Sequence, residues 1–286
     1  RGRGPRVPRP ILSAMTLSEL RAHANNASAA NAIAKELIRR NTSFSEVDSW
    51  LRLDRQEARW HETNFDGVVR QVRIMPFNYA GSAVFQAMAG RADPAAIVAS
   101  VDWLESPIRW GDGRMALRRF AVRVLQAASP SVALPIARRW WSSRRLRPYA
   151  LDLFEVHADP EDIQRIIPVL GWRFAVGTHH VIDGALDVLL KHTRYGPFPG
   201  LESLYHRAAM SCTRERVAKL LALTEPGFGR GLAYECLWDA EESTRVIAIG
   251  AVDLTTNGAR ERLEATAANS HGWESAAEAA KARLGA

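Results

Sequence analysis

Hydrophobic residues recur at intervals of three and four along most of the chain, which is the spacing of one face of a helix. The first such series follows a capping box, in which Thr16 and Glu19 cap the start of a helix. We therefore expect an amphipathic helix from residue 17 to about residue 40.

A second capping box, formed by Ser43 and Glu46, predicts another helix that continues to residue 58. The helical spacing then stops between residues 63 and 80. Residues 68–74 fit either a short strand or an extended link, and Pro76 excludes a helix interior at that point.

From residue 93 onward, an N-cap residue followed by proline starts three segments of similar pattern. These starts are Asp93-Pro94, Ser129-Pro130 and Asp159-Pro160. Each is followed by a second helical pattern, and further pairs are expected at residues 213–224 with 231–241, and 258–268 with 273–284. Helix pairs that recur every 30 to 45 residues are typical of an α-solenoid, in which each pair buries its apolar face on the next.

Several stretches of residues 91–286 resemble HEAT-type repeats. The resemblance is carried by the DPxxI openings at Asp93 and Asp159, the second helix ALRRFAVRVL, and the closing stretch ARERLEATAANSHGWESAAEAAKARL. It implies a curved scaffold whose faces bind proteins or nucleic acid, with enzymes as a minority of the family.

We therefore expect an all-α protein, built as one elongated HEAT-like solenoid of stacked helix pairs. Residues 1–15 are rich in arginine and proline and predict a short disordered tail. Residues 16–90 are expected to form an N-terminal helical segment, and residues 91–286 the repeats.

Positive charge is concentrated in the middle of the chain. The net charge is +7, yet residues 109–147 hold ten arginines against a single acid, Asp112. Residues 148–286 hold 14 basic and 19 acidic side chains. Such a change of sign within one chain suggests an anionic partner for the middle segment.

The candidate anion-binding residues are nine arginines and one tryptophan of this segment. They are Arg114, Arg118, Arg119, Arg123, Arg138, Arg139, Trp141, Arg144, Arg145 and Arg147. On a helix from residue 131, Trp140 falls in the apolar arc and is expected in the core, whereas Trp141 lies at its edge. Arginine beside an aromatic ring suits phosphate contact and base stacking. The alternative is a solvated pair of helices, neutralised by the acidic C-terminal half.

Two other motifs suggest chemistry less directly. His179 and Asp183 lie four residues apart and share a helix face, so they are weak candidates for metal binding. No third ligand accompanies them, and an ordinary polar helix face explains them equally. The glycines between residues 227 and 231 lack the context of a nucleotide loop and predict a connector. We expect no cofactor.

The leading hypothesis is a non-enzymatic scaffold that binds another protein, or nucleic acid, through the basic segment 109–147. The alternative is a DNA-binding repair protein that resembles the HEAT-like glycosylases of alkylated purines. In that case Trp50 and Asp54, four residues apart, would place an indole beside a carboxylate.

Composition narrows the setting. No stretch of 18 apolar residues is present, so we expect no membrane span or membrane partner. The two cysteines, Cys212 and Cys236, exclude a disulfide scaffold and favour a reducing, cytoplasmic location.

Overall fold

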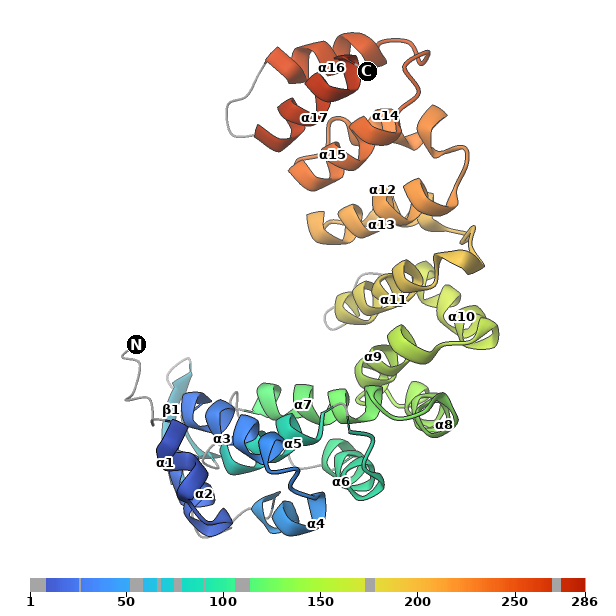
Figure 1. Cartoon of the computed structure of the whole chain (residues 1–286). Helices are drawn as coiled ribbons and strands as arrows, with labels where there is room; N and C mark the ends of the chain where they lie inside the picture. Colours follow the sequence, from blue (N-terminus) through green and yellow to red (C-terminus); the bar gives the residue numbers. More distant parts are fainter. Residues whose placement is uncertain are drawn as a thin grey trace. The chain divides into compact units, whose positions relative to one another are not determined.

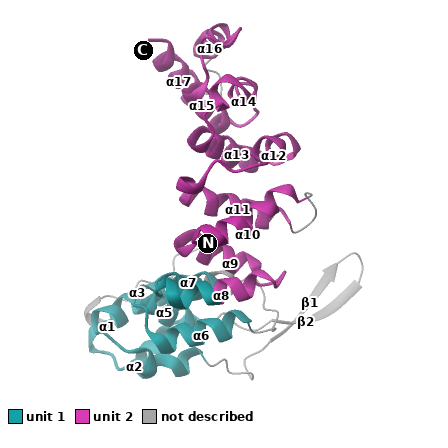
Figure 2. Ribbon diagram, turned by 90° about the vertical axis from the view of Figure 1, so that its right-hand side faces the viewer, with its two compact units in different colours: residues 1–135 teal, residues 136–286 magenta. Residues whose placement is uncertain are grey.

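The chain forms two compact units, residues 1–135 and residues 136–286 (Figure 2). The computed structural model describes residues 9–25, 27–51, 59–65, 68–74, 79–89, 91–105, 114–172, 178–268 and 274–285. For residues 9–11, 27, 59–65, 68–74 and 114–117 it describes the backbone alone.

The described part of the chain is helical, as predicted, apart from one β-hairpin. Strands β1 (Arg59–Phe65) and β2 (Val68–Ile74) pair antiparallel, with Arg59 opposite Ile74 and Phe65 opposite Val68. Of the two alternatives for residues 68–74, the strand is therefore the one observed.

Unit 1 is built around α5. Its helices are α1 (Arg9–Ala14), α2 (Leu17–His23), α3 (Ala27–Arg39), α4 (Phe44–Val47), the 3₁₀ helix η1 (Asp48–Leu51), α5 (Tyr79–Met88), α6 (Pro94–Glu105) and α7 (Arg114–Gln126). Helix α5 packs against α3, α6, α7 and η1. Its small residues let these neighbours approach closely, and Val84 and Phe85 are fully buried.

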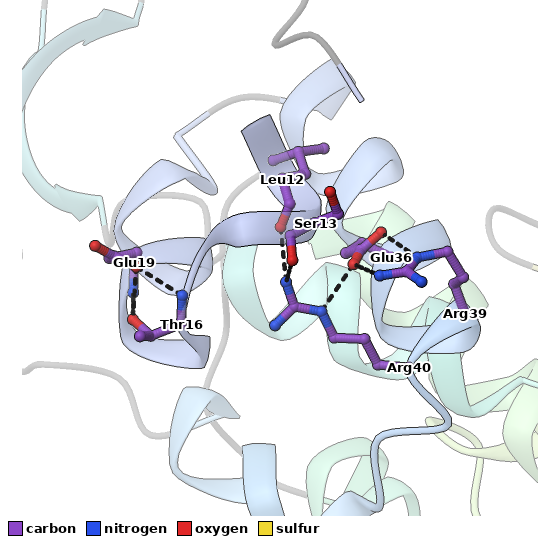
Figure 3. A network of polar contacts seen from close by, with 7 residues as sticks. All are labelled: Leu12, Ser13, Thr16, Glu19, Glu36, Arg39 and Arg40. Atoms are coloured by element: carbon purple, nitrogen blue, oxygen red, sulfur yellow. Dashed lines mark hydrogen bonds and ion pairs between the residues drawn. The ribbon is translucent and has the colours of Figure 1, made fainter. Parts of the chain in front are cut away.

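The capping box at Thr16 starts α2 as predicted, but the helix does not continue to residue 40. Glu19 donates its backbone N–H to Thr16 Oγ1 at 3.3 Å, and its carboxylate accepts from the Thr16 N–H at 2.6 Å (Figure 3). The chain leaves the helix after His23, where Asn25 N–H bonds to the His23 carbonyl at 2.8 Å. The helical hydrogen bonding is thus interrupted between α2 and α3, which form two helices.

The disordered tail predicted for residues 1–15 extends too far along the chain, because part of this segment is helical. Residues 1–8 lie outside the described residues, whereas residues 9–14 form helix α1. Leu12 of this helix is 3% exposed, so α1 is anchored by an apolar side chain.

Polar contacts from the end of α3 hold α1 in place. Arg40 donates from Nη2 to the carbonyls of Leu12, at 2.7 Å, and Ser13, at 3.2 Å, which are among the last carbonyls of α1 (Figure 3). Glu36 Oε1 accepts from Arg40 Nε at 2.8 Å and so orients it, while Arg39 donates to both oxygens of Glu36. This network gives the N-terminal residues a fixed place that composition alone did not suggest.

Unit 2 contains a series of helices that pack on one another in order. Those described are α8 (Pro130–Trp141), which begins in unit 1, α9 (Arg147–His157), α10 (Pro160–Ile166), α11 (His179–Lys191), α12 (Leu201–Arg207), α13 (Ser211–Thr224), α14 (Leu232–Cys236), α15 (Glu242–Ala251), α16 (Ala259–Ala268) and α17 (Glu274–Gly285). Helices α9, α11, α13, α15 and α17 each pack against the next in this series (Figure 1). Helices α12, α14 and α16 pack against α13, α15 and α17 respectively.

The proline-marked helix starts are confirmed. Helices α6, α8 and α10 begin at Pro94, Pro130 and Pro160. Asp93 accepts at Oδ1 from the backbone of α6, and a complete capping box precedes α10. The local signals therefore placed these starts at the correct residue.

The boundary between the two compact units falls inside α8, between Pro135 and Ile136. Helices α6 and α7 pack on α5 and share a core with the N-terminal helices. These two helices therefore belong to unit 1 together with the N-terminal helices.

Candidate functional site

The arginine-rich segment 109–147 is shared between the two units. Unit 1 contains α7, and unit 2 contains the end of α8, the following turn and the start of α9. Arg109 and the side chain of Arg114 lie outside the described residues. The segment therefore supplies two separate sets of arginines.

The arginines of α7 lie along the margin of its buried face. Arg118 is half-buried, whereas Arg119 and Arg123 are exposed. The guanidinium carbon of Arg123 lies 5.9 Å from the centre of the Phe120 ring. Because Arg119 and Arg123 are one turn apart, they present two positive charges on one face of the helix.

On α8 the buried stripe contains Ala133, Ala137 and Trp140. Trp140 is 1% exposed, which confirms that it is a core residue. Val132, on the same helix, is 41% exposed and lies outside this buried stripe.

Arg138 is engaged in an internal ion-pair network with the start of α10. Its Nε donates to Asp162 Oδ1 at 2.8 Å, and its Nη2 donates to Asp162 Oδ2 at 3.0 Å and to Asp159. Asp162 is completely buried, and Asp159 is the N-cap residue of α10. Arg138 therefore joins α8 to α10 and is neutralised within its own unit, in contrast to its predicted place among the anion-binding residues.

The pKa shifts of Arg138 and Asp159 have the directions expected for an ion pair. The hydrogen bond with Asp162 raises the pKa of Arg138. Burial on its own would raise the pKa of Asp159, but hydrogen bonds from the Asp162 backbone and from Arg138 outweigh it and hold that pKa below its ordinary value. Both groups are thus charged across the neutral range.

Trp141 lies against Arg147 and Phe154. The guanidinium carbon of Arg147 lies 5.3 Å from the centre of the Trp141 ring and 5.0 Å from that of Trp172. Arg147 Nε also donates to the Trp141 carbonyl at 2.8 Å. The rings of Trp141 and Phe154 pack edge to face, with 5.9 Å between their centres. Trp141 is half-buried, and Arg147 ties the turn between α8 and α9 to both indoles.

Three arginines of this region are exposed: Arg139, Arg144 and Arg145, which we call the turn arginines. Arg139 lies in the last turn of α8, where a positive charge also interacts favourably with the helix dipole. The turn beneath them is fixed, because Leu146 is buried and its N–H bonds to the Ser143 carbonyl at 3.1 Å. A rigid backbone therefore presents the turn arginines to solvent.

No contact between Trp50 and Asp54, the two residues of the glycosylase alternative, is seen in the described part of the chain. Trp50 is 3% exposed within η1 and belongs to the core of unit 1. Asp54 lies outside the described residues.

His179 and Asp183 take part in local packing. The His179 ring lies 3.7 Å from that of His180, and Asp183 accepts a hydrogen bond from Thr213 Oγ1 at 2.7 Å. Asp187, one turn further, pairs with Arg216 at 2.7 Å. These acids join α11 to α13, and no group of three or more metal ligands occurs among the described residues.

Sequence reasoning missed a buried polar cluster that links α12, α13 and the turn after α14. Arg214 donates to both oxygens of Asp239, at 2.7 and 3.0 Å, and Tyr205 donates to Asp239 Oδ2 at 2.7 Å. Burial and this hydrogen bonding raise the pKa of Tyr205. The partners are 25 and 34 residues apart, so no local spacing signals the cluster.

Comparisons with protein-family models, with curated proteins and with solved structures found no match. None of the helices in the described part of the chain combines the length and apolar character needed to cross a membrane.

Proposed function

We propose that this chain is a non-enzymatic helical-repeat scaffold that binds an acidic surface of a protein partner through the turn arginines. The single observation that carries this proposal is the exposure of Arg139, at the end of α8, and of Arg144 and Arg145, on the turn that follows it.

The packing of unit 2 supports a HEAT-like solenoid. Helices α9, α11, α13, α15 and α17 form a continuous series, and helices α12, α14 and α16 each pack on a member of it. In such an array each layer contacts its neighbours, so the surface is extended and suited to a macromolecular ligand. Polar pairs between neighbouring helices, such as the half-exposed pair of Asp187 with Arg216, join α11 to α13.

The charges support an anionic ligand. Arg138 is paired inside the unit, whereas Arg139, Arg144 and Arg145 are exposed to solvent. Exposed cationic groups attract an anionic surface and raise the rate of encounter with it.

The surroundings of Trp141 favour a protein partner over nucleic acid. Stacking of a base requires an open aromatic face. Trp141 instead has Arg147 over its ring and Phe154 packed against it, and Arg147 also covers Trp172. Without a stacking surface, contact at this turn is electrostatic, as in the rim of a protein–protein interface.

The test is a binding titration with two probes, a labelled poly-L-glutamate chain and a labelled DNA duplex, followed by fluorescence anisotropy over a range of salt. We expect poly-L-glutamate to bind and its affinity to fall with salt. The double variant Arg144→Ala and Arg145→Ala should weaken binding by about tenfold, since each rim charge contributes modestly.

The matched control is Arg165→Ala, because Arg165 is an exposed arginine of α10 in the same unit. It should leave the affinity for poly-L-glutamate unchanged. Tighter binding of DNA than of poly-L-glutamate, with a slope of about 0.9 in log affinity per phosphate contact, would overturn the choice of a protein partner. Equal loss in the control and in the double variant would overturn the site.

The glycosylase alternative has a direct assay. It would be supported by release of methylated purines from alkylated DNA and loss of that release in Asp54→Asn. Because Trp50 is buried, no observation in the described part of the chain favours this activity over the scaffold.

A further inference from the structure

Unit 2 contains a pocket of about 560 Å³ that shares no residue with the turn arginines. It lies where the 3₁₀ helix η5 (Phe228–Arg230), the end of α15 and the last turn of α17 meet. Both η5 and α17 pack on α15, and Figure 1 shows α17 beside it. A hydrogen bond from the Asp253 N–H to the Gly229 carbonyl, at 2.9 Å, joins the turn after α15 to η5. The packing of unit 2 therefore fixes the walls of this pocket.

The glycine loop at residues 227–231 forms one wall, but its backbone does not form a phosphate cradle. The N–H of Arg230 donates to the Gly227 carbonyl at 3.1 Å, and the N–H of Gly231 donates to the Phe228 carbonyl at 3.2 Å. These donors are engaged within the loop, whereas a backbone anion site needs successive N–H groups that point at the ligand. Recognition in this pocket consequently depends on side chains.

Two exposed arginines line the pocket, Arg230 from η5 and Arg283 from α17. Neither forms an ion pair with a carboxylate in the described part of the chain. Arg283 donates from Nη2 to the Val252 carbonyl at 3.5 Å, which places its guanidinium group beside the turn after α15. Because a guanidinium group has five N–H donors, both arginines keep donors for a ligand.

Asp253 supplies the opposite charge in the same pocket. Its Oδ1 accepts from the N–H and the Oγ1 of Thr255, at 2.9 and 2.7 Å, whereas its Oδ2 has no hydrogen-bond donor among the described residues. The hydrogen bonds from Thr255 lower the pKa of Asp253, and the charges of Arg230 and Arg283 lower it further. Asp253 is therefore ionised at neutral pH and lies near both arginines without pairing with either.

These three charges favour a ligand that has a carboxylate with an N–H donor next to it. Two arginines and one aspartate leave a single positive charge, which favours a monoanion over a dianion such as phosphate. The unused Oδ2 of Asp253 needs a donor. A glutamate side chain has no donor beside its carboxylate, whereas the last residue of a peptide carries an amide N–H and a carboxylate on the same Cα.

We infer that this pocket binds the C-terminal carboxylate of a peptide segment of a protein partner. The carboxylate accepts from Arg230 and Arg283, and the N–H of the last residue donates to Asp253 Oδ2. Pro226 and Leu254 supply apolar surface for the side chain of that residue. Because both arginines are exposed, a chain end reaches them from solvent while the rest of the peptide stays outside the pocket. The inference is independent of the proposed function.

The test is fluorescence anisotropy with a peptide that carries fluorescein at its N-terminus and ends in Gly-Leu with a free carboxylate. One matched peptide ends in leucine amide, and another ends in N-methyl-leucine with a free carboxylate. We expect saturable binding of the first peptide. The amide should bind at least about tenfold more weakly, because the charged acceptor is lost. The N-methyl peptide should bind about fivefold more weakly, because it lacks the donor to Asp253.

Variants of the exposed arginines locate the site. Arg230→Gln and Arg283→Gln should each weaken binding of the free acid about fivefold, the upper end for an exposed charge pair. Arg260→Gln, at an exposed position of α16, should leave the affinity unchanged. The double variant Arg144→Ala and Arg145→Ala should do the same, which separates this site from the turn arginines.

Equal binding of the free acid and the amide would overturn the inference, as would equal affinities in Arg260→Gln and Arg283→Gln. Competition decides the class of ligand. If inorganic phosphate, free leucine or an amidated glutamate peptide displaces the labelled peptide at a lower concentration than the unlabelled free acid does, the pocket is not a site for a peptide C-terminus.

Discussion

The guanidinium carbon of Arg147 lies 5.3 Å from the centre of the Trp141 ring, and Arg147 Nε donates to the carbonyl of the same tryptophan at 2.8 Å. One side chain therefore fixes both the backbone and the ring of Trp141, across the turn that carries the turn arginines. The same guanidinium carbon lies 5.0 Å from the centre of the Trp172 ring. Arg147 therefore also contacts Trp172, which directly follows the 3₁₀ helix η3 (Ile167–Gly171).

Replacement of Arg147 by lysine should destabilise the turn although the charge is kept. Lysine lacks the planar group that stacks between two indoles and the Nε–H that reaches the Trp141 carbonyl. We expect Arg147→Lys to lower the free energy of unfolding by about 1–2 kcal/mol, measured by denaturant titration. The control Arg144→Lys, at an exposed position of the same turn, should stay within about 0.5 kcal/mol.

Loss of the Arg138 side chain should be costly, because it leaves the fully buried Asp162 without its main cationic partner. We expect Arg138→Ala to lower the free energy of unfolding by about 3 kcal/mol, the lower end of the range for a broken buried pair, since Arg138 is one-third exposed. In a double-mutant cycle, Arg138→Ala combined with Asp162→Ala should cost less than the two single changes added together. Simple additivity would show that the pair is not coupled.

The parts of the fold that the sequence predicts well are those with a local cause. A capping side chain acts within three residues of the helix start, and an N1 proline acts at its own position, so Thr16, Asp93 and Asp159 marked their helices correctly. Trp140 was placed in the core for a similar reason, because helical periodicity is read within a few turns.

The remainder depends on partners that are distant in sequence. Arg138 was assigned to an anion-binding surface from its neighbours at 139, 144 and 145, but its carboxylates come from 21 and 24 residues further along. Helix α1 is likewise held by Arg40, 28 residues away from Leu12. Charge counting along the chain cannot separate an arginine that faces solvent from one that is neutralised by packing, because that difference arises from tertiary contacts.

Glu36 should make unit 1 sensitive to acid. The hydrogen bond from Arg39, assisted by Arg40, lowers the pKa of Glu36 from 4.5 to about 2 although burial opposes this. A folded-state pKa below the unfolded value means that the stabilisation is complete above pH 4.5 and is lost as the pH falls toward about 2.

Glu36→Gln removes that titration and should flatten the dependence of the unfolding free energy on pH between pH 4.5 and about 2. The measurement is denaturant unfolding across this window. Asp102→Asn, at an exposed position of α6, is the control and should keep the wild-type slope. A slope in Glu36→Gln equal to that of the wild type would contradict the assignment to this carboxylate.

The two cysteines should differ strongly in reactivity. Cys236 is fully buried, and burial raises the pKa of its thiol to about 11, whereas Cys212 is half-buried on α13. Since the thiolate is the reactive form, iodoacetamide should modify native Cys212 at least about tenfold faster than Cys236. Mass spectrometry of peptides after timed quenching measures both rates, and the difference should vanish in denaturant.

Two glycines of unit 2 offer a matched pair of substitutions with opposite expected signs. A Cβ at Gly229 would lie 2.4 Å from the carbonyl oxygen of Ala251. This atom belongs to the backbone, so a change of side-chain rotamer cannot relieve the clash. The Gly229 carbonyl also accepts a hydrogen bond from the Asp253 N–H at 2.9 Å. A Cβ at Gly250, in α15, would meet nothing within 4 Å.

Gly229→Ala must therefore displace the end of α15 or the glycine loop, and we expect it to lower the free energy of unfolding by about 1–3 kcal/mol. Gly250→Ala should raise it by about 0.5–1 kcal/mol, because alanine restricts the unfolded chain and favours the helix. Thermal and denaturant unfolding of both variants measure the two effects. A stable Gly229→Ala protein would mean that residues 227–231 are not packed on the end of α15, so that the loop would have to be considered again as a site for ligands.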